Sequence, residues 1–217
     1  MKKSIPVLPD LTGWKDRSVD ERHESYVSLN HLSPHIRCIP QHYRMGLPGT
    51  RHEMLVRSSV ASRLLHASYN LPKHYSFVIW DTWRHPSTEN VLHERCSMTD
   101  TSLAETWFPR FPGPHQTGGS LSLSILDANG RTLDMGTTFD EWTLHACTRY
   151  YEEKMEQGEV LSSEDITRLH NRRLLFHLMQ DAGFVNHPAC WYQFHYGNAY
   201  WAAATGEPAC YHPSLLP

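Results

Sequence analysis

From residue 120 to residue 125, serine alternates with a large aliphatic side chain, and this pattern limits the fold more than any other feature of the chain. Successive side chains of a β-strand point to opposite faces of a sheet. We therefore predict a half-buried strand over residues 120–126, with a polar face that lines a cavity. Its apolar face carries Leu121, Leu123 and Ile125, and its polar face carries Ser120, Ser122 and Ser124.

The rest of the chain supplies helices and further strands around this one. We predict four helices, over residues 53–69, 86–96, 141–156 and 163–181. Apolar residues at helical spacing indicate the first, Pro86 begins the second, and the capping pattern of Ser162 and Asp165 begins the last. Short β-rich runs predict strands over residues 75–80, 131–135, 189–195 and 199–203. Prolines and a glycine predict a loop over residues 99–113. Helices grouped with a small antiparallel sheet indicate the α+β class.

Length and charge exclude several kinds of protein. A chain of 217 residues suits a single domain, here with residues 1–45 as an irregular N-terminal arm. The net charge is −3 and no basic stripe is present, so we expect no nucleic-acid partner. No apolar run approaches the roughly 18 residues of a membrane span, and the N-terminus lacks the apolar core of a signal peptide. We expect a cytoplasmic protein without a membrane partner, and the composition leaves the oligomeric state open.

Cysteine and histidine are frequent but scattered. The five cysteines form no Cys-x-x-Cys pair, and their odd number favours reduced thiols. Most of the sixteen histidines stand singly in mixed contexts, as His42 and His66 do. We expect nearly all of them to be surface or half-buried residues.

Three stretches of the chain resemble the core motifs of one enzyme family. Residues 114–125, 133–141 and 183–194 are similar to those of the VanX-type D-alanyl-D-alanine dipeptidases, peptidase family M15. The resemblance runs from about residue 43 to residue 201. It implies the family's fold, a central antiparallel sheet flanked by helices, and a pocket for a small-molecule or dipeptide-like substrate.

The resemblance also shows which chemical groups have been replaced. The first family motif is a His followed, seven positions later, by an Asp, and both bind zinc; here His115 stands in place but the second position is Ser122. The second motif supplies a catalytic Glu and a third His ligand, and Cys190 and Gln193 occupy those positions. Zinc needs about four strong ligands, and a neutral hydroxyl or amide is a weak one. We therefore expect no metal and no other cofactor, and reject ordinary zinc hydrolysis as the first choice.

Arg84 and Cys190 are the side chains from which a metal-independent chemistry would be built. Arg84 lies where the family's arginine stabilises oxyanion charge, and its guanidinium keeps that charge without a metal. The alternative is a structural salt bridge, for example to Asp81. The thiol of Cys190 would lie near His115 and Arg84 and act as a nucleophile or acid/base group, or else simply fill space in the core.

The remaining candidates would shape the pocket. His195 follows Gln193 by two residues and would face the same side of a strand, as a base or as a structural residue. We expect Ser120, Ser122, Trp191, Tyr192 and Gln193 to contact the substrate. Asp134 and Asp140 are assigned to turn and capping hydrogen bonds.

Three functions remain open from the sequence. The first is an enzyme converted to metal-independent chemistry on a small amino-acid- or dipeptide-like molecule, in which Arg84, His115, Cys190 and His195 act. By analogy with other old folds, such an enzyme would belong to a biosynthetic route. The second is a binding protein that has lost the chemistry. The third is a zinc dipeptidase with relocated ligands, namely His115, Cys190 and His195.

Overall fold

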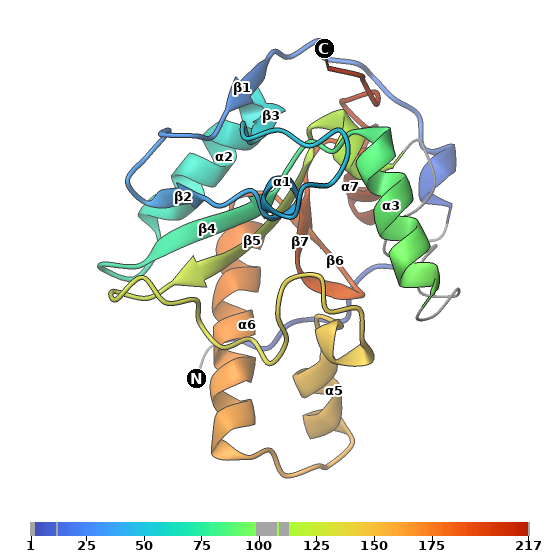
Figure 1. The fold of residues 1–217 in the computed structure, drawn as a ribbon. Coiled ribbons are helices and arrows are strands. Elements are labelled where there is room, and N and C mark those ends of the chain that lie inside the picture. The colour runs from blue at the N-terminus through green and yellow to red at the C-terminus, as the bar shows by residue number, and fades with distance from the viewer. Residues whose placement is uncertain (1–2, 12, 99–107, 109–112, 217) are drawn as a thin grey trace.

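The computed structural model describes residues 3–11, 13–98, 108 and 113–216, and its centre is a mixed five-stranded sheet (Figure 1). The strand order is β2-β4-β5-β7-β6, in which only the β2–β4 pair is parallel. A separate two-stranded antiparallel sheet pairs β1 with β3. The strands are β1 (Tyr26–Ser28), β2 (Ile36–Cys38), β3 (Leu55–Arg57), β4 (Ser76–Asp81), β5 (Ser120–Leu126), β6 (Val185–His187) and β7 (Cys190–His195).

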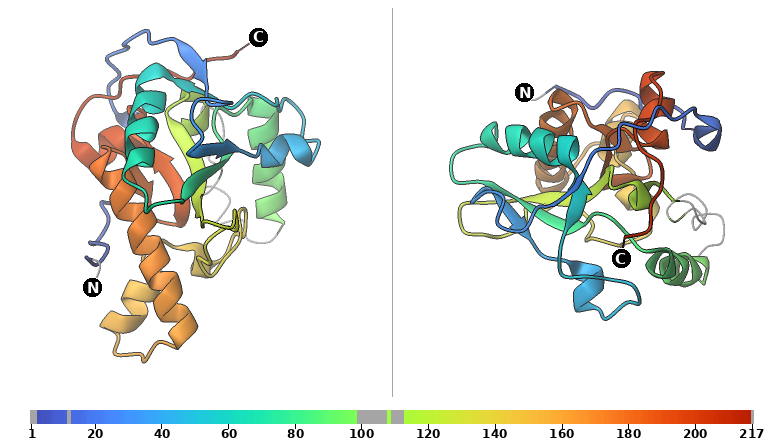
Figure 2. Two further views of the ribbon diagram at one scale, coloured as in Figure 1. Left: turned by 90° about the vertical axis from the view of Figure 1, so that its left-hand side faces the viewer. Right: turned by 90° about the horizontal axis from the view of Figure 1, so that it is seen from above.

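Helices cover both faces of the central sheet, which confirms the predicted α+β class. Figure 2, left, shows the sheet between α2 and α6 on one side and α3 on the other. In Figure 1, α5 and the first half of α6 extend beyond the sheet. The helices are α1 (Gln41–Arg44), α2 (Ser58–Tyr69), α3 (Pro86–Ser97), α5 (Tyr150–Glu156), α6 (Ser163–Asp181) and α7 (Ala199–Thr205), with 3₁₀ turns η1 (Trp14–Asp16), η2 (Pro114–Thr117) and η3 (Leu144–Ala146). Within the described ranges, no helix has the length and apolar character needed to cross a membrane.

The alternating strand is found where it was predicted, but it is more deeply buried than expected. β5 has the predicted bounds, and all seven of its residues are buried. It lies at the centre of the sheet, with β4 on one side and β7 on the other. The expected half-buried strand is therefore wrong, because β5 has neighbours on both sides and its serine face is also covered, with His195 and Asn198 against Ser120.

Several predicted elements differ from the structure. Residues 199–203 form part of helix α7 instead of a strand, because the Asn198 side chain accepts the backbone N–H of Trp201 at 3.1 Å and caps the helix start. Within residues 131–135, only Thr132 makes a strand-like bridge, to Leu126. Two helices begin later in the chain than predicted. The helix predicted over residues 53–69 begins at Ser58, because residues 55–57 are β3, and the helix predicted over residues 141–156 is divided into a 3₁₀ turn over residues 144–146 and α5 over residues 150–156.

Two further predictions concern segments outside the regular core. The predicted N-terminal arm includes β1, β2 and α1, so residues 26–45 belong to the folded body in large part. The loop predicted over residues 99–113 lies, apart from Phe108 and Gly113, outside the described residues.

Candidate functional site

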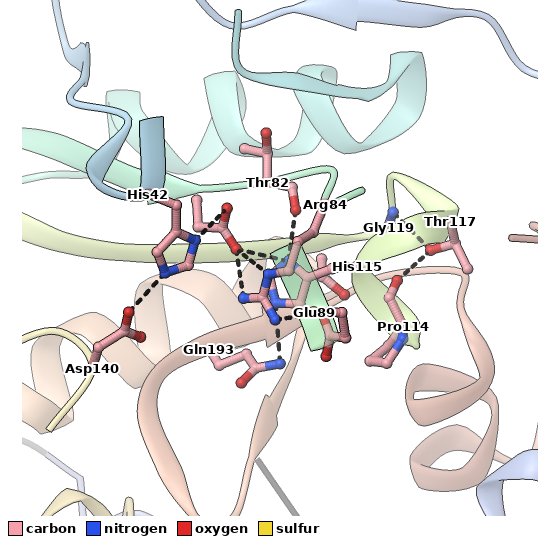
Figure 3. A network of polar contacts seen from close by, with 12 residues as sticks. His42, Thr82, Arg84, Glu89, Pro114, His115, Thr117, Gly119, Asp140 and Gln193 are labelled. Atoms are coloured by element: carbon pink, nitrogen blue, oxygen red, sulfur yellow. Dashed lines mark hydrogen bonds and ion pairs between the residues drawn. The ribbon is translucent and has the colours of Figure 1, made fainter. Parts of the chain in front are cut away.

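The positions singled out in the sequence meet where three strands end side by side. Ser122 of β5 pairs with Asp81 of β4 and with Gln193 of β7. The turn η2 brings His115 to the same place, and α3 contributes Glu89 (Figure 3). The side chains are buried, with exposed fractions of 1% for His115 and 7% for Gln193. Segments far apart in the sequence thus form one polar cluster inside the protein.

His115 is neutral and both of its ring nitrogens are hydrogen-bonded. Its Nδ1 lies 2.6 Å from the carbonyl oxygen of Thr82 and 3.3 Å from Oδ2 of Asp81. Burial, and then the charge of Arg84, lowers the pKa of His115 to about 3. The single proton is on Nδ1, because that nitrogen faces two acceptors, so Nε2 carries the lone pair. The amide nitrogen of Gln193 lies 3.2 Å from Nε2 and donates to it.

The residues at this position do not fit a zinc ion. A ligating histidine offers a ring lone pair to the metal, and here the amide of Gln193 engages that lone pair. The neighbouring position holds the hydroxyl of Ser122, a weak zinc ligand. Across residues 3–11, 13–98, 108 and 113–216, no group of three or more His, Cys, Asp or Glu side chains is arranged to hold a metal ion.

Arg84 is held in a buried ion-pair network. Its Nε and Nη2 donate to Oδ2 of Asp81 at 3.1 and 2.6 Å, and its Nη1 donates to Oε2 of Glu89 at 2.7 Å. Burial opposes ionisation of the guanidinium, but the two carboxylates outweigh it and raise the pKa of Arg84. Of the two roles considered from the sequence, the structure places Arg84 in the salt bridge to Asp81. This pairing leaves the guanidinium charge largely compensated inside the protein.

Sequence reasoning missed His42, which joins this network to the protein surface. His42 Nε2 lies 2.7 Å from Oδ2 of Asp140, and its Nδ1 lies 3.3 Å from Oδ1 of Asp81. Burial favours the neutral ring, but the charges of Asp81 and Asp140 outweigh it and raise the pKa of His42 to about 9. The expectation of a surface or half-buried residue was wrong, because His42 is only 2% exposed. No local pattern signals this role, since Asp140 is 98 positions away in the chain.

Cys190 does not join the cluster around His115. Strand alternation turns Cys190 away from the face that carries Gln193. Its thiol lies against Tyr192, and burial raises its pKa. In the described part of the chain, no hydrogen bond or ion pair connects Cys190 with His115 or Arg84. The expected proximity of these three groups is therefore wrong, and a protonated thiol packed in the core is what the structure places here.

His195 lies in a second buried polar group. Its Nδ1 is 3.0 Å from Oγ of Ser120 and 3.1 Å from the side-chain nitrogen of Asn198. Its ring stacks on Tyr200 at 4.9 Å between centroids, and the ring of His187 is 5.9 Å away. Burial, and then His187 and His115, lowers the pKa of His195 well below its usual value. His195 and Ser120 thus contact each other and the start of α7. On β7, His195 lies on the same face as Gln193.

A large cleft opens beside this network. Its volume is about 770 Å³, and its described walls include four aromatic and three acidic residues among other apolar and polar side chains. Of the residues predicted to form the site, Trp191 alone is among those that line it in the described chain. The cleft also contains Trp80, Phe139, Trp142, Arg95, Asp134, Asp140 and Glu141. Asp140 on the cleft wall contacts His42, and His42 in turn lies beside Asp81 of the cluster around His115.

Asp140 has an unusual backbone conformation at this cleft. Its φ angle is 59°, in the left-handed region that a residue with a side chain adopts only at a cost of about 1–3 kcal/mol. The hydroxyl of Tyr192 accepts its backbone N–H at 3.2 Å, and His42 binds its carboxylate. Strain of this kind persists where surrounding contacts hold the residue in place, and it is frequent at ligand sites. Tyr192 therefore positions Asp140 and is itself buried.

Comparison with known proteins identifies the family of the chain. The family model described as D-ala-D-ala dipeptidase matches residues 47–207, about three quarters of the chain. The chain belongs to this family. The matched segment contains every candidate residue named in the sequence, and His42 lies outside it.

The chain is also similar to a D-alanyl-D-alanine dipeptidase from Synechocystis sp. The two are 34% identical over 94 residues, which is 43% of this chain and 38% of the relative. The alignment therefore spans well under half of the relative's length.

Proposed function

We propose that this protein is a zinc-independent member of the D-alanyl-D-alanine dipeptidase family that binds a small amino-acid- or dipeptide-like molecule without hydrolysing it through zinc. The hydrogen bond from Gln193 to Nε2 of His115 carries the proposal. Zinc-dependent hydrolysis needs an open metal position and a carboxylate base. The corresponding positions here hold a neutral imidazole, a hydroxyl, an amide and a buried thiol.

The cleft supports a zwitterionic ligand. Arg95 is a cation on its wall, and Asp134, Asp140 and Glu141 are acidic. The indole rings of Trp80 and Trp191 add an apolar surface. A ligand with one ammonium and one carboxylate group would match both signs of charge, and a cleft of about 770 Å³ falls within the usual range of roughly 300–1,000 Å³ for small-molecule sites.

Asp140 is the residue that we assign to the ammonium group of this ligand. It lines the cleft, and its strained backbone is fixed from behind by His42 and Tyr192. A carboxylate held in advance loses little conformational entropy when the ligand binds. Asp140→Asn removes the charge and keeps the backbone conformation, since asparagine also tolerates the left-handed region.

Isothermal titration of chelator-treated protein with D-alanyl-D-alanine tests the proposal. We expect saturable binding without release of D-alanine, and a loss of affinity of about tenfold or more in Asp140→Asn. Asp181→Asn is the matched control, because it removes the same charge at an exposed position of α6. Release of D-alanine that stops on chelation would contradict the zinc-independent function, and an absence of binding would contradict the ligand assignment.

A metal-independent reaction is the second candidate, and one observation favours it. Asp140 and His42 form a carboxylate–imidazolium pair at 2.7 Å beside the cleft, and such a pair can exchange protons with a ligand. The reaction expected from the sequence would instead have used Arg84, His115, Cys190 and His195. Mass spectrometry of D-alanyl-D-alanine and its isomers after incubation separates the candidates, because a binder returns every compound unchanged.

A further inference from the structure

We propose a second ligand site, for a small planar organic anion, in a cavity whose described lining residues are separate from those of the cleft. The cavity has a volume of about 420 Å³ and lies between η1, η2, the start of α7 and the C-terminal segment. Figure 2, right, shows η1 beside α7. None of its described lining residues also lines the main cleft, so the inference is independent of the function proposed above.

The ionisable side chains of this cavity favour an anion. Lys15, Arg17 and His212 line it, and no carboxylate is present among the described lining residues. The chain as a whole has the opposite balance, with 23 acidic and 20 strongly basic residues. A local group of cations on an acidic protein raises the local concentration of anions and attracts them at long range.

Asp16, Asp20, Glu21 and Glu24 lie on the same N-terminal segment, but none of them lines the cavity, and Glu21 is engaged with backbone groups. Glu21 accepts the backbone N–H groups of His23 and His212, and it therefore fastens the C-terminal segment to the N-terminal one. Burial alone would raise the pKa of Glu21, but these two hydrogen bonds outweigh it and the pKa is lowered. Its carboxylate supports the wall of the cavity. Lys15 and Arg17 are exposed on the wall, and the ammonium of Lys15 lies 5.5 Å from the centroid of the Trp14 ring.

The apolar walls favour a flat, largely hydrophobic body. Trp14 stacks on Tyr200 with 4.6 Å between centroids and 18° between planes, so its indole is fixed in advance. Tyr211 is 1% exposed and its hydroxyl donates to Glu24 at 3.1 Å. Pro114 completes the walls with other small and apolar residues, among them Val19, Ala199 and Pro213. Rigid aromatic walls with flexible cations at the rim fit an aryl or indolyl carboxylate.

The cavity lies against the turn η2, which carries His115. Pro114 and Thr117 line it and flank His115 in the turn η2. An occupant would therefore bridge the N-terminal segment, the C-terminal segment and this turn. Binding to the folded state alone stabilises that state, so the unfolding temperature rises as the ligand concentration increases relative to the dissociation constant.

Indole-3-acetate is the probe that tests this site. Titration calorimetry of the full chain should show saturable binding that weakens as salt rises, and the neutral isostere indole-3-acetamide should bind about tenfold more weakly. Lys15→Gln combined with Arg17→Gln should lower the affinity for indole-3-acetate by about tenfold or more. The matched control, Arg44→Gln with Lys73→Gln, removes the same charge from exposed positions outside the cavity and should change affinity less than about twofold.

Three results would overturn the site. They are an absence of saturable indole-3-acetate binding, equal binding of the acetamide, and an unchanged affinity in the Lys15/Arg17 double variant. Excess D-alanyl-D-alanine should not displace the probe. Displacement would place the probe in the main cleft and would also overturn this proposal, while leaving the cleft assignment intact.

Discussion

His42 is the residue whose charge most affects the cluster behind the cleft. Its pKa rises from 6.5 to about 9 in the folded protein because Asp81 and Asp140 favour the protonated ring, so the folded state holds this proton more tightly than the unfolded state. The resulting stabilisation is complete below pH 6.5 and is lost as the pH rises through 9. At about 1.4 kcal/mol per pKa unit, it is on the order of 3 kcal/mol.

His42→Gln should remove this stabilisation. We expect a loss of unfolding free energy on the order of 3 kcal/mol at neutral pH, because the buried carboxylate of Asp81 and the partly exposed carboxylate of Asp140 lose their shared cation. The variant should also lose the wild-type decline in stability above neutral pH. Urea unfolding over that pH range measures both effects, with His66→Gln, at an exposed position, as the control. A variant that keeps the wild-type pH profile would show that His42 is not the titrating group.

At the scale of single elements, α6 offers the clearest test of a local signal. The Ser162 hydroxyl accepts the backbone N–H of Asp165 at 3.1 Å, as the capping pattern in the sequence predicts. Ser162→Ala should lower the unfolding free energy by about 1 kcal/mol, since one helix N–H loses its acceptor. Ser163→Ala, one residue inside the helix, should have a smaller effect in the same urea titration. Equal effects of the two variants would contradict a specific capping role of Ser162.

Elements with strong local patterns were predictable, and those that depend on tertiary contacts were not. The alternation in β5 and the cap and periodicity of α6 gave correct bounds. The aromatic pair Tyr200–Trp201 favoured a strand, but the cap at Asn198 and the alanines that follow make this segment α7. The register of β5 against β7 placed Ser122 beside Gln193 as the motifs implied. The contacts of Arg84 and the depth of His42 depend on residues distant in sequence, and no local pattern encodes them.

At the scale of the whole molecule, buried neutral histidines make the protein sensitive to mild acid. Burial lowers the pKa of His115 to about 3 and that of His187 to about 4, whereas both groups titrate near 6.5 when the chain is unfolded. The unfolded state therefore binds more protons below pH 6.5, and stability falls as the pH decreases. We expect a loss of several kcal/mol between pH 6.5 and 4.5, a range above the usual pKa of most carboxyl groups. Urea midpoints that stay constant over this range would contradict the buried, neutral state of these rings.

We propose that hydrogen-bonded protein groups stand where the family would hold a zinc ion. Elemental analysis of protein purified from zinc-supplied cells measures this, with Ser122→Asp combined with Gln193→His as the reference that restores a carboxylate and an imidazole beside His115. We predict zinc well below one equivalent in the natural chain, and a clear increase in the double variant. About one equivalent of tightly held zinc in the natural chain would contradict the account.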